Sequence, residues 1–506
     1  MKNNCLILLL IARFLLSTQA ALCQQVSEKD ISAFARSPRY TSIVAFYEAG
    51  GGQVTWFGPD SLHEPLTTLL ESAASYALFA DDYRATSSPA VGGSALVNKD
   101  IRLTDAALHF FGDLKAGNRT PTLSYAGLSY EPETQLDASE IQLLRSGRLQ
   151  ELERSFRPRT DAYGTLLGLL LHFQLVQRTP GFREARVRFP FTATQHSEFM
   201  LRLYQLGLLR RADTILTDIQ MQQTIVRTQM HFALSTNGKV TQALVTALNV
   251  PLQQRSAELC ASINLLRWLE GLRRKGALLA LNIASADMVV VAGDDTLLYS
   301  RIVAGKPATP TPTLTSTITE VILFPFWMVP HKIATRELLP LIKASRATLD
   351  VGNFQVLDRA GRVVDPRRIN WKSLNAGNFP YVLRQMSGCD NALGIVKFNF
   401  NNPFTVYLHD TPSKGLFSTD HRFYSHGCMR VEKPDALAHL LLGTNRMAID
   451  TVTAKGCLHQ AGPKTIRAER PLPLVVFYAT AWSTPKGEPR FFQDVYQRNA
   501  LLRRQP

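Results

Sequence analysis

One short segment of this chain has the residue types of a cysteine nucleophile with its catalytic support. It runs Ser425-His426-Gly427-Cys428-Met429-Arg430, and His409 precedes it. A thiol attacks a carbonyl only as the thiolate, so a histidine that takes its proton is the expected partner. Gly427 allows a tight turn beside Cys428, where consecutive N–H groups can face a developing oxyanion. Because His409 lies too far upstream for contact along one helix or strand, the fold must bring it to Cys428.

The spacing of these residues resembles the catalytic motif of YkuD-type L,D-transpeptidases. A strand-like segment, 405–408, leads to His409, a spacer covers 410–424, and Ser-His-Gly-Cys is followed two positions on by a basic residue. The resemblance implies acyl transfer through a thioester on Cys428, with His409 as general acid and base. It assigns the backbone N–H groups of Gly427 and Cys428 to the oxyanion, and His426 to shaping the pocket and polarising the carbonyl.

Two neighbouring residues are predicted to support this pair. Asp410 would orient the His409 imidazole through its carbonyl, or alternatively contribute its carboxylate. Ser425 would stabilise the nucleophile loop rather than react.

Ser425 and Asp410 are also expected to line the substrate site, and two further residues are predicted to contact substrate. Arg430 would bind a substrate carboxylate, with a surface ion pair to Glu432 as the alternative. Trp327 lies in Phe324–Pro330, which resembles the Pro-x-Trp-x-Val-Pro segment of the family, and its ring is also expected to pack into the core.

Cysteine and histidine spacing predicts neither a metal site nor a cofactor. The sequence has no C-x-x-C arrangement and no His-x-x-x-His pair of the kind that binds zinc. If Cys428 is the nucleophile, Cys260, Cys389 and Cys457 remain beyond the first 23 residues. One disulfide can form among these three, and the sequence leaves its pairing open.

The composition indicates a globular chain, and the first 23 residues indicate export. Of its 506 residues 45% are hydrophobic and 19% charged, which excludes a disordered chain. The formal net charge of +15 favours an anionic partner, either a cell-wall polymer or a membrane surface. A nucleic-acid partner is not predicted, because the sequence has no dense stripe of Lys and Arg with interleaved aromatic residues. Residues 1–23 have the basic start, short apolar run and small residues of a signal peptide. An uncleaved leader that tethers the protein is the alternative.

Hydrophobic periodicity divides the chain into a helical first half and a mostly β second half. This multi-domain α+β organisation resembles that of the large YcbB-like L,D-transpeptidases. The expected order is a signal peptide (1–23), a helical scaffold domain (24–189), a three-helix peptidoglycan-binding-like domain (190–255), a helical connector (256–276), a catalytic domain (277–460) and a C-terminal tail (461–506). In the tail, 474–478 is expected to form a last strand. Within the catalytic domain, the resemblance assigns the long insertion 331–386 as a capping lobe over the cleft.

The three-helix domain departs from its family pattern at two places, Gln229–Phe232 and Asn237-Gly238. Glycan binding and a purely structural spacer are therefore both open for residues 190–255.

The resemblance implies an L,D-transpeptidase that forms 3→3 cross-links in peptidoglycan. It would transfer the acyl group of a tetrapeptide stem to a second stem, with release of D-Ala, in the periplasm. Carbapenems would acylate Cys428, and wall-synthesis proteins would be partners. An L,D-carboxypeptidase, a hydrolase that releases wall-bound proteins, and an inactive wall-binding scaffold are the alternatives.

Overall fold

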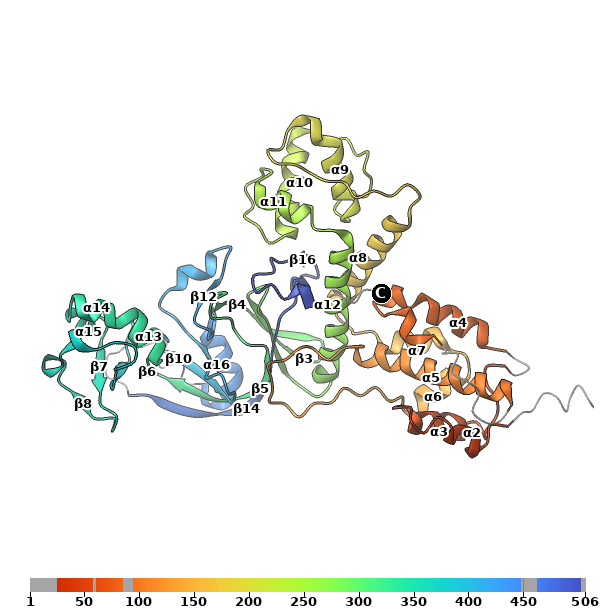
Figure 1. The fold of residues 1–506 in the computed structure, drawn as a ribbon, viewed down its shortest axis with the longest axis horizontal. Helices are drawn as coiled ribbons and strands as arrows, with labels where there is room; N and C mark the ends of the chain where they lie inside the picture. The colour runs from red at the N-terminus through yellow and green to blue at the C-terminus, as the bar shows by residue number, and fades with distance from the viewer. Residues whose placement is uncertain (1–24, 58–60, 85–93, 447–448, 450–461, 502–506) are drawn as a thin grey trace, which may run out of the picture.

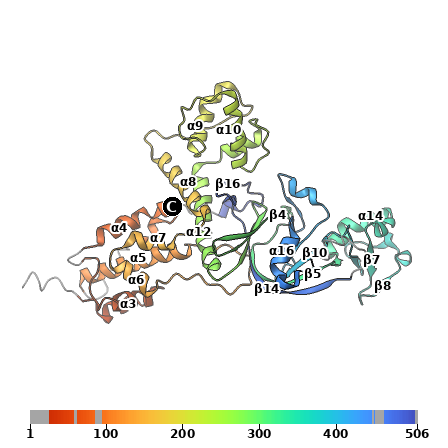
Figure 2. The same cartoon turned by 180° about the vertical axis from the view of Figure 1, so that it is seen from behind.

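The computed structural model describes residues 25–57, 61–84, 94–446, 449 and 462–501. A helical N-terminal region lies at one end, a small α+β lobe at the other, and a β-sheet between them (Figures 1 and 2). Three helices of the segment 190–255 project away from the sheet (Figure 1). The helical first half and mostly β second half confirm the predicted fold class. The predicted signal peptide lies outside the described residues, and none of the described helices is long and apolar enough to cross a membrane.

The N-terminal region packs around one long central helix, α5 (Ala95–Ala116), which Ser94 caps. Its buried Asp100 accepts hydrogen bonds from the Tyr47 hydroxyl at 2.6 Å and the Trp56 N–H at 2.7 Å, so the buried carboxylate is satisfied. Around it lie α2 (Glu28–Ser32), α3 (Tyr40–Glu48), α4 (His63–Glu71), α6 (Ala138–Arg145) and α7 (Leu149–Phe156). The next helix, α8 (Asp161–Arg178), belongs to a second core and packs on α12 (Leu252–Arg273).

The segment 190–255 contains the three helices α9 (His196–Gln205), α10 (Asp218–His231) and α11 (Gln242–Leu248), and α12 (Leu252–Arg273) follows as the connector. The two places where the sequence departs from the family pattern contact each other. The Gln229 amide donates to Asn237 Oδ1 at 2.7 Å, and the Gly238 N–H donates to Gln229 Oε1 at 3.0 Å. These side chains therefore hold the turn after α10 in place.

A ten-stranded sheet forms the centre of the catalytic region, in the order β1-β5-β10-β11-β13-β4-β3-β2-β14, with β12 paired to β4. Because β14 also pairs with β5, the sheet closes on itself. Its strands are β1 (Tyr125–Ala126), β2 (Leu278–Asn282), β3 (Asp287–Ala292), β4 (Asp295–Gly305), β5 (Leu314–Leu323), β10 (Val396–Phe400), β11 (Leu408–His409), β12 (Phe423–Ser425), β13 (Met429–Val431) and β14 (Lys464–Phe477). Helix α16 (Pro434–Leu442) packs its apolar face on the core that these strands enclose.

The predicted C-terminal tail is instead part of the fold. Strand β14 closes the sheet through pairing with β2 and β5. The hairpin of β15 (Ala481–Ser483) and β16 (Pro489–Phe491) then packs Phe491 against Phe173 and Phe232. The charged and proline residues of 467–473 interrupt the alternation in β14, which is why the sequence indicated only its last residues as a strand.

The insertion 331–386 forms a lobe with a core of its own. With the preceding strand β6 (Trp327–Met328), it makes a four-stranded sheet in the order β6-β9-β7-β8. Its other elements are α13 (His331–Ile333), α14 (Leu339–Ala344), α15 (Ala347–Val351), β7 (Phe354–Leu357), β8 (Val363–Val364) and β9 (Val382–Gln385). Val356, Trp371 and Leu383 are among its buried residues. An independent core makes this insertion a rigid lobe rather than a loose loop.

Candidate active site

The sheet places five polar and aromatic side chains on one face of three neighbouring strands. Lys397 of β10 pairs with His409 of β11, and His409 pairs with Arg430 of β13. Side chains alternate between the two faces of a strand, so the intervening residues face the core. The five on the outer face are Lys397, Tyr407, His409, Cys428 and Arg430, and all five line one cavity. The fold thus brings His409 and Cys428 to the same site.

Three hydrogen bonds fix the turn that carries the nucleophile. The Ser425 hydroxyl donates to the Cys428 carbonyl at 2.5 Å and accepts from the Gly427 N–H at 3.1 Å. The Thr311 hydroxyl, from the proline-rich turn after β4, donates to the Gly427 carbonyl at 2.9 Å. Gly427 has φ of 116°, a conformation that favours glycine. Ser425 therefore holds the loop, and the Gly427 N–H is already engaged by its hydroxyl instead of facing an oxyanion.

The imidazole of His409 is held by a backbone carbonyl. Its Nδ1–H donates to the carbonyl of Asp410 at 2.5 Å, which leaves Nε2 as the nitrogen that can exchange a proton. The Asp410 carboxylate is turned elsewhere, where it accepts from the Ile395 N–H at 3.0 Å and pairs with Lys414. Burial, together with the positive charge of Arg430, lowers the pKa of His409 to about 3, so the imidazole is neutral and able to accept a proton.

Burial raises the pKa of the Cys428 thiol, so the resting site holds a thiol rather than a thiolate. Four interactions act in the opposite direction. Hydrogen bonds from the backbone and phenol of Tyr407 lower the thiol pKa, as do the charges of Lys397 and Arg430. Burial raises the pKa of Tyr407, which keeps its phenol protonated and able to donate. The thiolate is thus stabilised once it forms.

Tyr407 and Lys397 are functional candidates that the sequence analysis did not identify. The Lys397 ammonium lies 4.1 Å from the centroid of the Tyr407 ring. Tyr407 could have been found as the residue two positions before His409, in the segment 405–408 that the sequence predicts as a strand. In the structure β11 begins only at Leu408. Lys397 gave no such signal, since it joins the site through the pairing of β10 with β11.

Arg430 does not pair with Glu432, so the surface ion pair considered from the sequence is wrong. Glu432 instead binds Arg301, whose Nε lies 3.0 Å from its carboxylate. The Nε of Arg430 is buried without a hydrogen-bond partner among the described residues, and burial lowers the pKa of this guanidinium. An unpaired cation beside the nucleophile is suited to a substrate carboxylate.

The cavity above this face has a volume of about 1100 Å³, and the lobe forms its other wall. Trp327, Met328, Lys332 and Glu337 line it from the lobe side. The ring of Trp327 packs on the lobe core near Phe354, as expected, and its side chain hydrogen bonds to Tyr407. Its contact with substrate stays a prediction. His426 lines the same cavity, and its Nε2 lies 2.6 Å from Glu337 Oε1.

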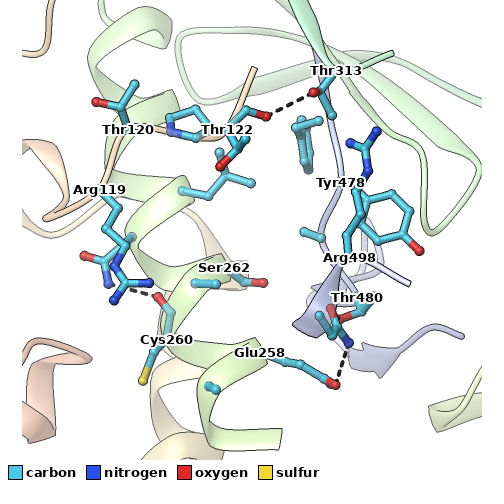
Figure 3. Close-up of a pocket in the computed structure, with 18 of the residues that line it drawn as sticks. Arg119, Thr120, Thr122, Glu258, Cys260, Ser262, Thr313, Tyr478, Thr480 and Arg498 are labelled. Atoms are coloured by element: carbon cyan, nitrogen blue, oxygen red, sulfur yellow. Dashed lines mark hydrogen bonds between the residues drawn. The ribbon is translucent and has the colours of Figure 1, made fainter. Parts of the chain in front are cut away.

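Other cavities lie away from this chemistry. One of about 410 Å³ separates α12 from segments 119–122 and 478–480, and Cys260 borders it (Figure 3). Cys260 is a free thiol whose pKa burial raises to about 12, which leaves it unreactive. Cys428 is also free, whereas Cys389 is disulfide-bonded, and Cys457 lies outside the described residues. No group of three metal-binding side chains occurs within the described ranges.

Comparisons with known proteins identify two family matches along the chain. Residues 277–453 match the YkuD family, described as the L,D-transpeptidase catalytic domain, and residues 41–170 match the Scaffold domain family. Over 204 residues the chain is 38% identical to the Haemophilus influenzae protein named "Putative L,D-transpeptidase", a stretch that is 40% of each chain.

Two solved structures also match. The L,D-transpeptidase from Mycobacterium smegmatis is 16% identical, covers 40% of this chain and 58% of its own, and gives a TM-score of 0.19. The Ldtfm-avibactam carbamoyl enzyme is 12% identical, covers 52% of this chain and 81% of its own, and gives a TM-score of 0.18. From its family matches, the chain carries a YkuD-family L,D-transpeptidase catalytic domain behind a Scaffold domain, a YcbB-like organisation.

Proposed function

We propose that this protein is an L,D-transpeptidase that forms 3→3 cross-links between peptidoglycan stem peptides. The observation that carries the proposal is the neutral, buried His409 together with a free Cys428 in one cavity between the sheet and the lobe. The cavity also contains three cations, Lys332, Lys397 and Arg430, which suit the carboxylates of a stem peptide.

The first half of the proposed reaction forms a thioester. His409 Nε2 takes the Cys428 proton as the thiolate attacks the carbonyl between the third residue of the stem and its terminal D-Ala. The Tyr407 phenol and the charge of Lys397 stabilise the thiolate, as their effect on its pKa indicates. The C–N bond breaks, and His409 returns the proton to the departing D-Ala amine.

The second half transfers the acyl group to an acceptor. The amine of a second stem attacks the thioester carbonyl, the C–S bond breaks, and Cys428 is released. The N–H of Cys428 is the oxyanion donor in this proposal, because the Gly427 N–H donates to Ser425. Water in place of the amine would give an L,D-carboxypeptidase, and a protein-linked donor would give a hydrolase that releases wall proteins.

The remaining expectations follow from this activity. We propose that the protein is located in the periplasm, either free after cleavage of the leader or tethered to the membrane by an uncleaved leader. Its proposed partners are stem peptides, glycan and wall-synthesis proteins. Carbapenems would acylate Cys428. For residues 190–255 we favour a spacer, because Gln229 and Asn237 hydrogen bond within the domain. Retention of this protein on purified sacculi when Cys428 is blocked would instead support glycan binding.

The test is incubation of the purified protein with disaccharide-tetrapeptide, beside Cys428→Ala, followed by mass spectrometry. A dimer that has lost one D-Ala, with the new bond 3→3 and no product from the variant, would support the transpeptidase. Tripeptide alone would favour the carboxypeptidase. If neither protein forms a product, an inactive scaffold or a protein-linked donor becomes the better assignment.

A further inference from the structure

The catalytic cavity has an unequal distribution of charge. Among the described residues that line it, Glu337 is the one carboxylate, facing the three cations Lys332, Lys397 and Arg430. Glu337 comes from the capping lobe, between α13 and α14, and its side chain is 48% exposed. A lone acid in a cavity of cations is a specific place for a positively charged group.

His426 holds this carboxylate beside the nucleophile loop. Its Nε2–H donates to Glu337 Oε1 at 2.6 Å, and His426 stands two residues before Cys428. The Nζ of Lys306 lies 3.5 Å from the same His426 nitrogen. The Glu337 carboxylate of the lobe is therefore bound to the nucleophile loop through His426, and a lysine ammonium lies close to that histidine. His409 reaches the cavity from a different element, β11.

The proposed reaction has one cationic reactant, the acceptor amine. A primary amine has a pKa near that of lysine, about 10.4, so it arrives as an ammonium. We infer that Glu337, positioned by His426, forms the acceptor subsite, and that it selects an amine carrying a nearby carboxylate, which Lys306 and Lys332 would bind. This inference rests on the proposed function and deepens it.

Acyl transfer to the acceptor removes two protons from its ammonium group. The ammonium loses one proton to solvent through Glu337, and the free amine attacks the thioester carbonyl. The C–N bond forms and the C–S bond breaks. The second amine proton passes to His409 and from there to the departing Cys428 thiolate. Water needs no such partner, so loss of Glu337 should favour hydrolysis over cross-linking.

The experiment compares full-length wild type, Glu337→Gln and Asp350→Asn with disaccharide-tetrapeptide, and measures D-Ala release and the ratio of cross-linked dimer to tripeptide. Asp350 is an exposed acid of the same lobe that does not line the cavity, so its amide variant is the matched control. A charged hydrogen bond of this kind is worth about a tenfold change, so Glu337→Gln should lower the ratio about tenfold, with a much smaller change in D-Ala release. Glu337→Asp should recover most of the ratio, and Asp350→Asn should match wild type.

A second arm tests the acceptor class. Free diaminopimelate and 1,5-diaminopentane, which lacks carboxylates, compete as acceptors for the wild type and Lys332→Met. We expect the wild type to prefer diaminopimelate and the variant to lose much of that preference. An unchanged dimer ratio in Glu337→Gln overturns the inference while the transpeptidase stands. If wild type releases D-Ala but forms only tripeptide, the inference also fails, and no D-Ala release overturns both.

Discussion

Two buried histidines lie in very different regions of this molecule, His409 in the catalytic sheet and His231 at the end of α10. Burial is the main cause that lowers the pKa of each to about 3. In each, one ring nitrogen bonds a backbone carbonyl, that of Asp410 for His409 and that of Pro489 for His231. The pKa and the carbonyl contact therefore do not distinguish a catalytic histidine from a structural one.

The two histidines differ in what surrounds their second ring nitrogen. His231 packs between Phe232 and Phe491, with ring centroids 5.0 and 5.3 Å away, and its Nε2 is buried without a partner among the described residues. His409 lines a cavity that also contains the Cys428 thiol. A perturbed pKa indicates function only where the group can reach a substrate.

The largest expected effect comes from replacing each histidine in turn. His409→Gln removes the general base, so the rate of D-Ala release should fall about 10²–10⁴-fold. His231→Gln should leave this rate within about twofold, because the ring touches no residue of the catalytic cavity. Single-turnover D-Ala release measures both. A comparable loss in His231→Gln, in protein shown to be folded, would mean that the three-helix domain participates in the reaction.

A smaller effect should follow from disturbing the support of His409 without touching the ring. A Cβ at Gly394 would lie 2.2 Å from Asp410 Oδ2, and the residue has φ of +61°. Gly394→Ala should therefore push Asp410 and its carbonyl out of position, slow D-Ala release about tenfold and cost about 1–3 kcal/mol of unfolding free energy. Gly415→Ala is the control, since no atom lies within 4 Å of its added Cβ. Equal behaviour of the two variants would show that the Asp410 carbonyl does not position the base.

The same comparison shows what could be predicted from the sequence. The Cys428 motif and the upstream His409 were identifiable, because their order and spacer are local features of the chain. Lys397, Tyr407 and Glu337 were not predicted as functional. Strand register and the placement of the lobe depend on packing between distant segments, which alternation within one strand does not specify.

In the fold, too, local sequence patterns predicted some elements and not others. Helices with a clear apolar stripe were predictable, and the family resemblance predicted a lobe for the long insertion 331–386. Only the end of strand β14 was predicted, over 474–478, because charged residues and prolines interrupt the alternation before it. Its Leu472, Leu474 and Val476 nevertheless complete the core. Long-range pairing with β2 and β5 overrides the local pattern there.

A smaller effect should follow from removing a charge that stabilises the Cys428 thiolate. Lys397 supplies such a charge at the catalytic site, and no thiol lines the surroundings described for His231. The charge of Lys397 lowers the pKa of the Cys428 thiol, so Lys397→Met should shift the pH profile of Cys428 alkylation by iodoacetamide to higher pH. At neutral pH we expect alkylation to slow by up to about tenfold, in line with loss of a nearby opposite charge. Lys343→Met, an exposed lysine of the lobe, should leave the profile unchanged. A profile that does not move in Lys397→Met would assign the stabilisation of the thiolate to Tyr407 and Arg430.

The last prediction concerns stability instead of reaction rate, and there the two histidines should behave alike. Each has a folded-state pKa lowered from 6.5 to about 3, so the stability it contributes is present above pH 6.5 and is lost as pH falls towards 3. Within that window the unfolded chain binds a proton that the folded chain does not, which costs about 1.4 kcal/mol per pH unit for each histidine. His231→Gln should therefore flatten the fall of the unfolding midpoint between pH 6.5 and 4, measured by urea denaturation. His196→Gln, at an exposed histidine of the same domain, should keep the wild-type slope. An unaltered slope in His231→Gln would mean that His231 is protonated in the folded protein, and the similarity with His409 would then end at burial.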